Sequence, residues 1–194
     1  MKECIEGKKI NTEIRDKFEL FEDLVNNKKI VVSNQILLKT KENNRFWLKG
    51  FSEVTHSKID APIYLVVEQS LREEKYGIKL KCSTLANSPF FRFDSGGPAH
   101  RNANELIPLN EQSILTPHFN TFNEKGQLIA YKTPQLSNEK ESNAIVEDIN
   151  FGLSHFCNVA NMSLKNEDYP EVLEETPELA LDLVIPTFNG AKFE

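Results

Sequence analysis

A succession of short strand-like segments separated by turn signals constrains the fold of this chain more than any other feature. The clearest segment is 76–82, in which apolar residues alternate with polar ones that include Lys79 and Lys81. Strict alternation places the apolar side chains on one face of a strand and the lysines on the other. Similar segments occur at residues 28–40, 45–54, 61–70, 90–94, 113–122 and 127–133. Gly50 is a candidate β-bulge, and residues 123–126 have the composition of a hairpin turn.

Two amphipathic helices are predicted to flank these strands. The first begins at Thr12, a possible cap, and ends at Asn26 and Asn27; its apolar face is Ile14, Phe18, Phe21 and Val25. The last begins at Ser142 or Asn143, after a linker at 137–142, and its stripe is Ile145, Ile149, Leu153 and Phe156. Residues 101–112 are polar and rich in turn formers, so they are predicted to form a loop. The whole pattern predicts an α+β fold, with one antiparallel sheet, strongly curved or barrel-like, between N- and C-terminal helices.

The charge distribution divides the chain into two regions. The net charge is −6, and residues 165–194 carry eight acidic and two basic side chains, so residues 1–164 have 21 of each sign and sum to zero. We therefore predict an α+β domain at 1–164 and an acidic, proline-containing extension at 165–194. Within the extension, residues 179–188 are too apolar to remain solvated. We expect this segment to dock on the domain or on a protein partner.

Composition excludes several classes of protein. No run of about 18 apolar residues is present, so no membrane span is predicted, and the first residues lack the apolar stretch of a secretory signal. Three widely spaced cysteines, Cys4, Cys82 and Cys157, indicate reduced thiols and a cytoplasmic location. Because the glycine-rich nucleotide motifs and the common metal-ligand motifs are absent, no cofactor is predicted.

The densest group of polar side chains follows the strand at 90–94. Arg92 and Asp94 are two residues apart, so both point to the face opposite Phe91 and Phe93. A Gly-Gly-Pro turn then leads to His100 and Asn102, while His118 and Asn120 lie in the next extended segment. We expect two imidazoles, a guanidinium and a carboxylate to converge at one end of the sheet.

This combination of groups fits metal-independent RNA cleavage. His100 and His118 could act as base and acid, Arg92 could hold a phosphate, and Asp94 could orient one imidazole. Trp47, Lys79, Lys81, Asn102 and Asn120 are candidate RNA-binding residues, with stacking on Trp47. Two alternatives stay open: a weak His/Asp metal site, and turn chemistry in which Arg92 and Asp94 form a surface ion pair.

The same residues resemble a family of uncharacterised bacterial and prophage proteins. The shared pattern is R-x-D-x-G-G-P-x-H-x-N followed by P-H-x-H, and it covers Arg92, Asp94, Gly96, Gly97, Pro98, His100, Asn102, Pro117 and His118. The chain departs from the pattern at Asn120, where the family has a second histidine, and the resemblance spans about residues 12–160. More faintly, the Pro-His segment is similar to small toxins of toxin–antitoxin operons. The resemblance implies a mobile-element protein that acts as a toxin or against host defence.

Two functions are therefore predicted. The first is an RNase-like factor that acts on RNA or on a ribonucleoprotein, for example the guide RNA of a defence complex. The second is a non-enzymatic inhibitor that binds a basic, nucleic-acid-handling protein through residues 165–194. A neutral domain argues against avid, non-specific nucleic-acid binding, so the first function requires a local basic patch.

Overall fold

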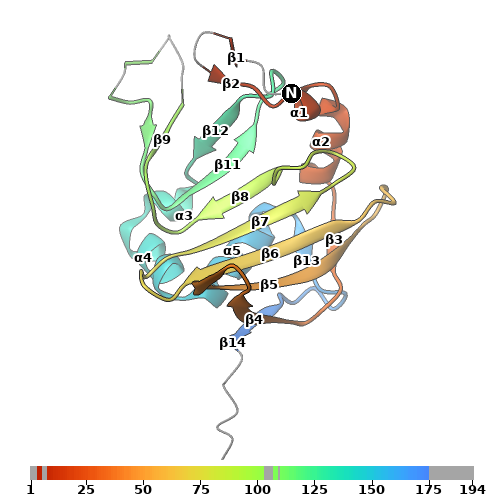
Figure 1. Ribbon diagram of the computed structural model, residues 1–194, viewed down its shortest axis with the longest axis vertical. Helices are drawn as coiled ribbons and strands as arrows, with labels where there is room; N and C mark the ends of the chain where they lie inside the picture. Colours follow the sequence, from red (N-terminus) through yellow and green to blue (C-terminus); the bar gives the residue numbers. More distant parts are fainter. Residues whose placement is uncertain (1–3, 6–7, 103–106, 109, 175–194) are drawn as a thin grey trace, which may run out of the picture.

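The computed structural model describes residues 4–5, 8–102, 107–108 and 110–174. Its main body is one ten-stranded, mostly antiparallel sheet that curves strongly into a half-barrel (Figure 1). Helices cover one face and one end of this sheet (Figure 1). The predicted α+β class and curved antiparallel sheet are confirmed. In the described part of the chain, no helix is both long enough and apolar enough to cross a membrane.

The elements follow the order expected from the sequence. The large sheet contains β3 (Lys29–Val31), β4 (Gln35–Lys41), β5 (Asn44–His56), β6 (Ile63–Ser70), β7 (Tyr76–Cys82), β8 (Phe91–Asp94), β11 (His118–Phe122), β12 (Leu128–Tyr131), β13 (Met162–Ser163) and β14 (Glu171–Glu174). Two small pairs lie outside it: β1 (Cys4–Ile5) with β2 (Lys8–Lys9), and β9 (His100–Arg101) with β10 (Ser113–Ile114). The helices are α1 (Thr12–Arg15), α2 (Phe18–Asn26), α3 (Pro134–Ser137), α4 (Glu139–Glu147) and α5 (Ile149–Val159).

The long strand β5 organises the sheet. One edge pairs with β6 along eight residues, and the other edge is shared by β4 near its start and by β3 near its end. From β6 the sheet continues through β7, β8 and β11 to β12, and all of these pairs are antiparallel. The hairpin turn predicted at 123–126 joins β11 to β12, with Gly126 at φ 71°. Strand β8, which carries Arg92, and strand β11, which carries His118, are therefore neighbours although they are distant in sequence.

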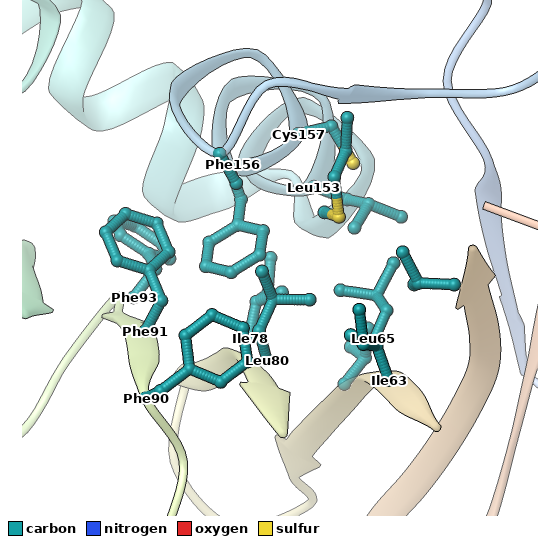
Figure 2. Packing of buried hydrophobic residues seen from close by; sticks show 14 of the residues in the cluster. Ile63, Leu65, Ile78, Leu80, Phe90, Phe91, Phe93, Leu153, Phe156 and Cys157 are labelled. Atoms are coloured by element: carbon teal, nitrogen blue, oxygen red, sulfur yellow. The ribbon is translucent and has the colours of Figure 1, made fainter. Parts of the chain in front are cut away.

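The core lies between the sheet and α5. Figure 2 shows Leu153 and Phe156 of α5 pointing toward Ile78 and Leu80 of β7. Each of these four side chains has a relative exposure of 0%. The predicted alternation of β7 is confirmed, because its even-numbered residues are buried and Lys79 and Lys81 lie on the opposite face. We call that opposite face of the sheet the outer face.

Two glycines allow close approaches between elements. At Gly152 in α5, an added Cβ would lie 1.7 Å from the hydroxyl oxygen of Tyr76, whose hydroxyl donates to the carbonyl oxygen of Ile145. At Gly50 in β5, an added Cβ would lie 2.7 Å from the Ile36 side chain. The prediction of a bulge at Gly50 was wrong: Gly50 pairs regularly with Val67, and the register of β4 against β5 shifts between Thr40 and Lys41. Gly50 is small because β4 passes close over it.

Several element boundaries differ from the sequence predictions. The first helix is interrupted at Lys17, and its cap is Asn11, which accepts from the backbone N–H of Ile14, rather than Thr12. The strand predicted at 28–40 is two strands, because Val32–Asn34 turn the chain from β3 to β4.

The linker predicted at 137–142 was wrong, because Ser137 ends α3 and Glu139–Ser142 belong to α4, with only Asn138 between the two helices. Asn138 caps α4 by accepting from the N–H of Glu141. The helix predicted beyond residue 142 is also divided, since Asp148 ends α4 and caps α5. Good N-cap residues inside a polar stretch therefore begin helices here.

The described part of the acidic extension belongs to the sheet. Strand β14 pairs in parallel with β4, and Val172 is 5% exposed. Asn150 of α5 bonds to both backbone groups of Val172, accepting from its N–H at 2.7 Å and donating to its carbonyl at 3.4 Å. The apolar segment 179–188 lies outside the described residues.

Candidate functional site

Strand β8 sets the geometry of the candidate site. Phe91 and Phe93 are buried in the core, so Arg92 and Asp94 lie on the outer face, as their alternation predicts. The sheet register determines which residues lie beside them. Arg92 lies between Lys79 and Asn120, and Asp94 lies between Gly77 and His118. Directly paired residues of neighbouring strands share a face. The outer face therefore brings together the predicted residues of three strands.

Asp94 is the centre of a polar network. Its Oδ2 atom accepts from Nε of Arg92 at 2.9 Å and from Nδ2 of Asn120 at 2.8 Å, and it lies 3.7 Å from Nε2 of His118. The departure from the family pattern at Asn120 thus supplies a donor to the carboxylate. The Arg92–Asp94 pair is only partly exposed, with side-chain exposures of 40% and 26%.

His118 and Asn120 are buried although they lie on the outer face. Their relative exposures are 2% and 1%, and His118 Nδ1 and Asn120 Oδ1 have no hydrogen-bond partner among the described residues. Burial lowers the pKa of His118 below its usual value, although Asp94 and the backbone of Leu115 act in the opposite direction. His118 is therefore a neutral, enclosed imidazole at neutral pH.

His100 and Asn102 contact the edge of the sheet at β12. The ring of His100 lies 6.4 Å from that of His118, measured between centroids, and its Nε2 is 3.3 Å from the carbonyl oxygen of Leu128. The side chain of Asn102 donates to the carbonyl of Ala130 at 2.7 Å and accepts from its N–H at 2.8 Å. Both residues thus bond to outward-facing backbone groups of β12. His100 and Asn102 of the motif therefore have a structural role, which is to bond to the backbone of β12.

A hollow of about 240 Å³ opens on the other side of Asp94. We call it the outer hollow; its walls include Trp47, Lys75, Lys79, Arg92 and Asp94, together with residues 96–98 of the Gly-Gly-Pro turn. Gly77 lies on the sheet between Glu68 and Asp94 in register, so the absence of a side chain there leaves space between the two carboxylates. Lys75 Nζ lies 5.7 Å from the centroid of the Trp47 ring.

The two carboxylates of the outer hollow, Glu68 and Asp94, differ in the hydrogen-bond and ion-pair partners of their oxygens. Glu68 has a lysine on each oxygen, since Lys79 bonds to Oε2 and Lys41 lies 3.0 Å from Oε1. Burial raises the pKa of Glu68, but the hydrogen bonds from Lys79 and Lys41 outweigh that effect and hold it below its usual value. Asp94, by contrast, uses only Oδ2 in the contacts described above.

The structure separates the predicted residues into three places. Arg92, Asp94, Trp47 and Lys79 line the outer hollow, His118 and Asn120 are buried behind Asp94, and His100 and Asn102 are at the β12 edge. Lys81 pairs with Tyr64 and is not among the lining residues.

Sequence reasoning missed Gly77, Glu68 and Lys75 as parts of the site. The alternation of β6 and β7 places Glu68 and Gly77 on the outer face, but only the register sets them beside Asp94.

Among the described residues, no group of three or more His, Cys, Asp or Glu side chains is arranged to hold a metal ion. Comparisons with protein-family models, with curated proteins and with solved structures found no match to this chain. The resemblance based on the strand-turn motif therefore stays a prediction, and function has to be argued from the geometry of the site.

Proposed function

We propose that the protein acts on RNA through the outer hollow. The observation that carries this proposal is the state of Arg92. Its Nε is fixed by Asp94, and neither of its terminal nitrogens bonds to an acceptor among the described residues. A guanidinium that is oriented but unsatisfied suits a phosphate, which accepts from two of its N–H groups at once.

Other groups in the outer hollow favour a nucleotide over a simple anion. Trp47 supplies an aromatic wall on which a base can stack, a contact worth about 1–3 kcal/mol per base in single-strand binding. Lys75 and Lys79 add positive charge beside Arg92, against the two carboxylates Glu68 and Asp94. Because Nζ of Lys75 is also paired with Glu73, the hollow is close to neutral, and phosphate binding is assigned to the guanidinium of Arg92 rather than to a general basic patch.

RNA binding is tested with a labelled single-stranded oligoribonucleotide and fluorescence anisotropy at several salt concentrations. We expect Arg92→Gln to weaken binding by about tenfold and to reduce the slope of log K against log salt by about one. Lys140→Gln is the matched control, because it removes one positive charge from the exposed surface of α4. Equal affinity of wild type and Arg92→Gln, or no RNA binding by the wild type, contradicts the proposal.

Cleavage is the stronger form of the same proposal, and it is measured on the same samples by gel electrophoresis. The RNase-like mechanism uses His100 and His118 as an acid–base pair, with the neutral His118 as the base, so His100→Ala and His118→Ala should each lower the rate by at least about 10²-fold, with little effect of EDTA. Since neither histidine lines the outer hollow and His118 is 2% exposed, the scissile phosphate would have to lie outside the hollow, on the His100 side of Asp94. Full activity in both variants contradicts this mechanism and leaves RNA binding as the function.

The setting of this activity follows from the resemblance alone. A mobile-element protein that holds RNA would act as a toxin on cellular RNA or as a counter-defence factor on the RNA of a defence complex.

The second candidate function is inhibition of a basic protein through the acidic extension. It is supported by Glu171 and Glu174, which are exposed on β14 at the edge of the sheet. A chain that ends at Glu174 and carries Glu171→Gln and Glu174→Gln separates the two functions, because it retains the outer hollow and loses six of the eight acidic side chains of the extension.

A further inference from the structure

The two oxygens of Asp94 have different surroundings. Oδ2 receives hydrogen bonds from Arg92 and Asn120, whereas Oδ1 has no hydrogen-bond partner among the described residues. Oδ1 faces the glycine of the neighbouring strand, since a Cβ built on Gly77 would lie 3.6 Å from it. Gly77 and Asp94 both line the outer hollow. Asp94 therefore presents one free acceptor to whatever occupies the hollow.

The orientation of this acceptor is fixed before a ligand arrives. Two donors on Oδ2 hold the carboxylate plane, and one of them, Asn120, is itself 1% exposed and packed in place. A carboxylate oxygen only accepts, so its ligand must offer an O–H or N–H group. The neighbouring guanidinium of Arg92, bonded to the same carboxylate through Nε, offers its remaining N–H groups to an acceptor such as a phosphate.

A ribose-phosphate unit satisfies both requirements with adjacent groups. The 2′-hydroxyl is a donor present on every ribonucleotide and missing from every deoxyribonucleotide. We propose that Asp94 selects RNA over DNA by accepting a hydrogen bond from a 2′-hydroxyl at Oδ1, while Arg92 binds the neighbouring phosphate. This inference rests on the proposed function and names its substrate class.

The substitution Asp94→Asn tests the inference with little change in shape. Because Arg92 Nε and Asn120 Nδ2 are both donors, an asparagine at position 94 turns its oxygen toward them and its amide nitrogen toward the outer hollow. The ligand hydroxyl then meets a donor in place of a charged acceptor. Asp60→Asn is the matched control, since it makes the same chemical change at an exposed aspartate that does not line the outer hollow.

The experiment measures the affinity of three oligonucleotides of one sequence: RNA, DNA and 2′-O-methyl RNA. We expect the wild type and Asp60→Asn to bind RNA about tenfold more tightly than either analogue, as a hydrogen bond to a charged group implies. In Asp94→Asn we expect RNA and 2′-O-methyl RNA to bind within about twofold of each other, because the amide nitrogen only donates and cannot accept from the 2′-hydroxyl. Thermal unfolding of each variant verifies that it is folded.

Each other outcome overturns the inference in a recognisable way. Equal binding of all three oligonucleotides by the wild type, or a preference for RNA over 2′-O-methyl RNA that persists in Asp94→Asn, contradicts the role of Asp94 while leaving nucleic-acid binding intact. Tight binding of 2′-O-methyl RNA shows that the donor is not the group recognised. If none of the three binds, the proposed function itself fails.

Discussion

Lys29 is a lysine side chain with a relative exposure of 0%. Its Nζ donates to the carbonyl oxygens of Val25 at 3.0 Å and of Asn27 at 2.6 Å, at the C-terminal end of α2. Burial lowers the pKa of Lys29 to about 8. Because a neutral amine still carries two hydrogens, it can satisfy both carbonyls without a buried charge.

The buried amine predicts a pH-dependent stability. The unfolded chain, with a lysine pKa near 10.5, binds more protons than the folded protein between pH 8 and 10.5. Stability therefore rises with pH across that window and is lowest below it. We expect the free energy of unfolding to rise by about 2 kcal/mol more in the wild type than in Lys29→Met between pH 7.5 and 9.5, as measured by urea denaturation. Lys28→Met, at the exposed neighbour, should follow the wild type; parallel curves for all three proteins would refute the prediction.

At the scale of residues, the sequence predicted the strand face on which a side chain lies better than it predicted which side chains are adjacent in the sheet. The alternation of β8 correctly put Arg92 and Asp94 together, because the direction of a side chain in a strand depends only on local geometry. The position of His118 beside Asp94 depends on the register of β11 against β8, which is set by packing of residues distant in sequence. The burial of His118 likewise depends on segments that cover the outer face, and the apolar periodicity of β11 does not indicate those segments.

At the scale of elements, the contact between α5 and β7 relies on Gly152. A methyl group there would overlap the hydroxyl of Tyr76, which is held by the carbonyl of Ile145. Neither the tyrosine nor the helix can shift without breaking buried packing.

We expect Gly152→Ala to destabilise the protein by about 2 kcal/mol or more, despite the higher helix propensity of alanine. Tyr76→Ala alone should also destabilise it, by creating a cavity. In the double variant the alanine at position 152 meets no ring, so the two losses should not add. Chemical denaturation of the four proteins measures this coupling. Additive losses would mean that Gly152 is tolerant of a side chain.

The errors in element prediction occur at helix caps and at chain breaks, which apolar periodicity does not indicate. The polar stretch around Asn138 was predicted to be a linker, yet it begins α4 because a capping side chain and an acidic first turn favour a helix start. The long helices and strands were each expected to be continuous, and the structure divides them at Lys17, Val32–Asn34 and Asp148. Apolar periodicity continued across these breaks, so it could not reveal them.

At the scale of the molecule, the described start of the acidic extension joins the sheet through β14. Strand β14 buries Val172 against the core, and its neighbour Pro170 is buried as well. A chain that ends at Leu164 loses these contacts together with the pairing to β4. We expect it to be less stable than a chain that ends at Glu174 by about 2 kcal/mol or more, the value for burying one such side chain. Thermal and urea unfolding of the two truncated chains measure the difference; equal stabilities would contradict the prediction.

The same hydrogen-bond arrangement occurs at two edge strands of the sheet. Asn102 bonds to both outward backbone groups of Ala130 on β12, and Asn150 does the same for Val172 on β14. An open strand margin is a template on which a strand from another molecule can add, the first event in fibre growth. Here an amide side chain already occupies each template, so a foreign strand must displace two hydrogen bonds before it can attach. Replacing either asparagine with alanine would therefore leave an edge strand open to added pairing, at positions outside the outer hollow.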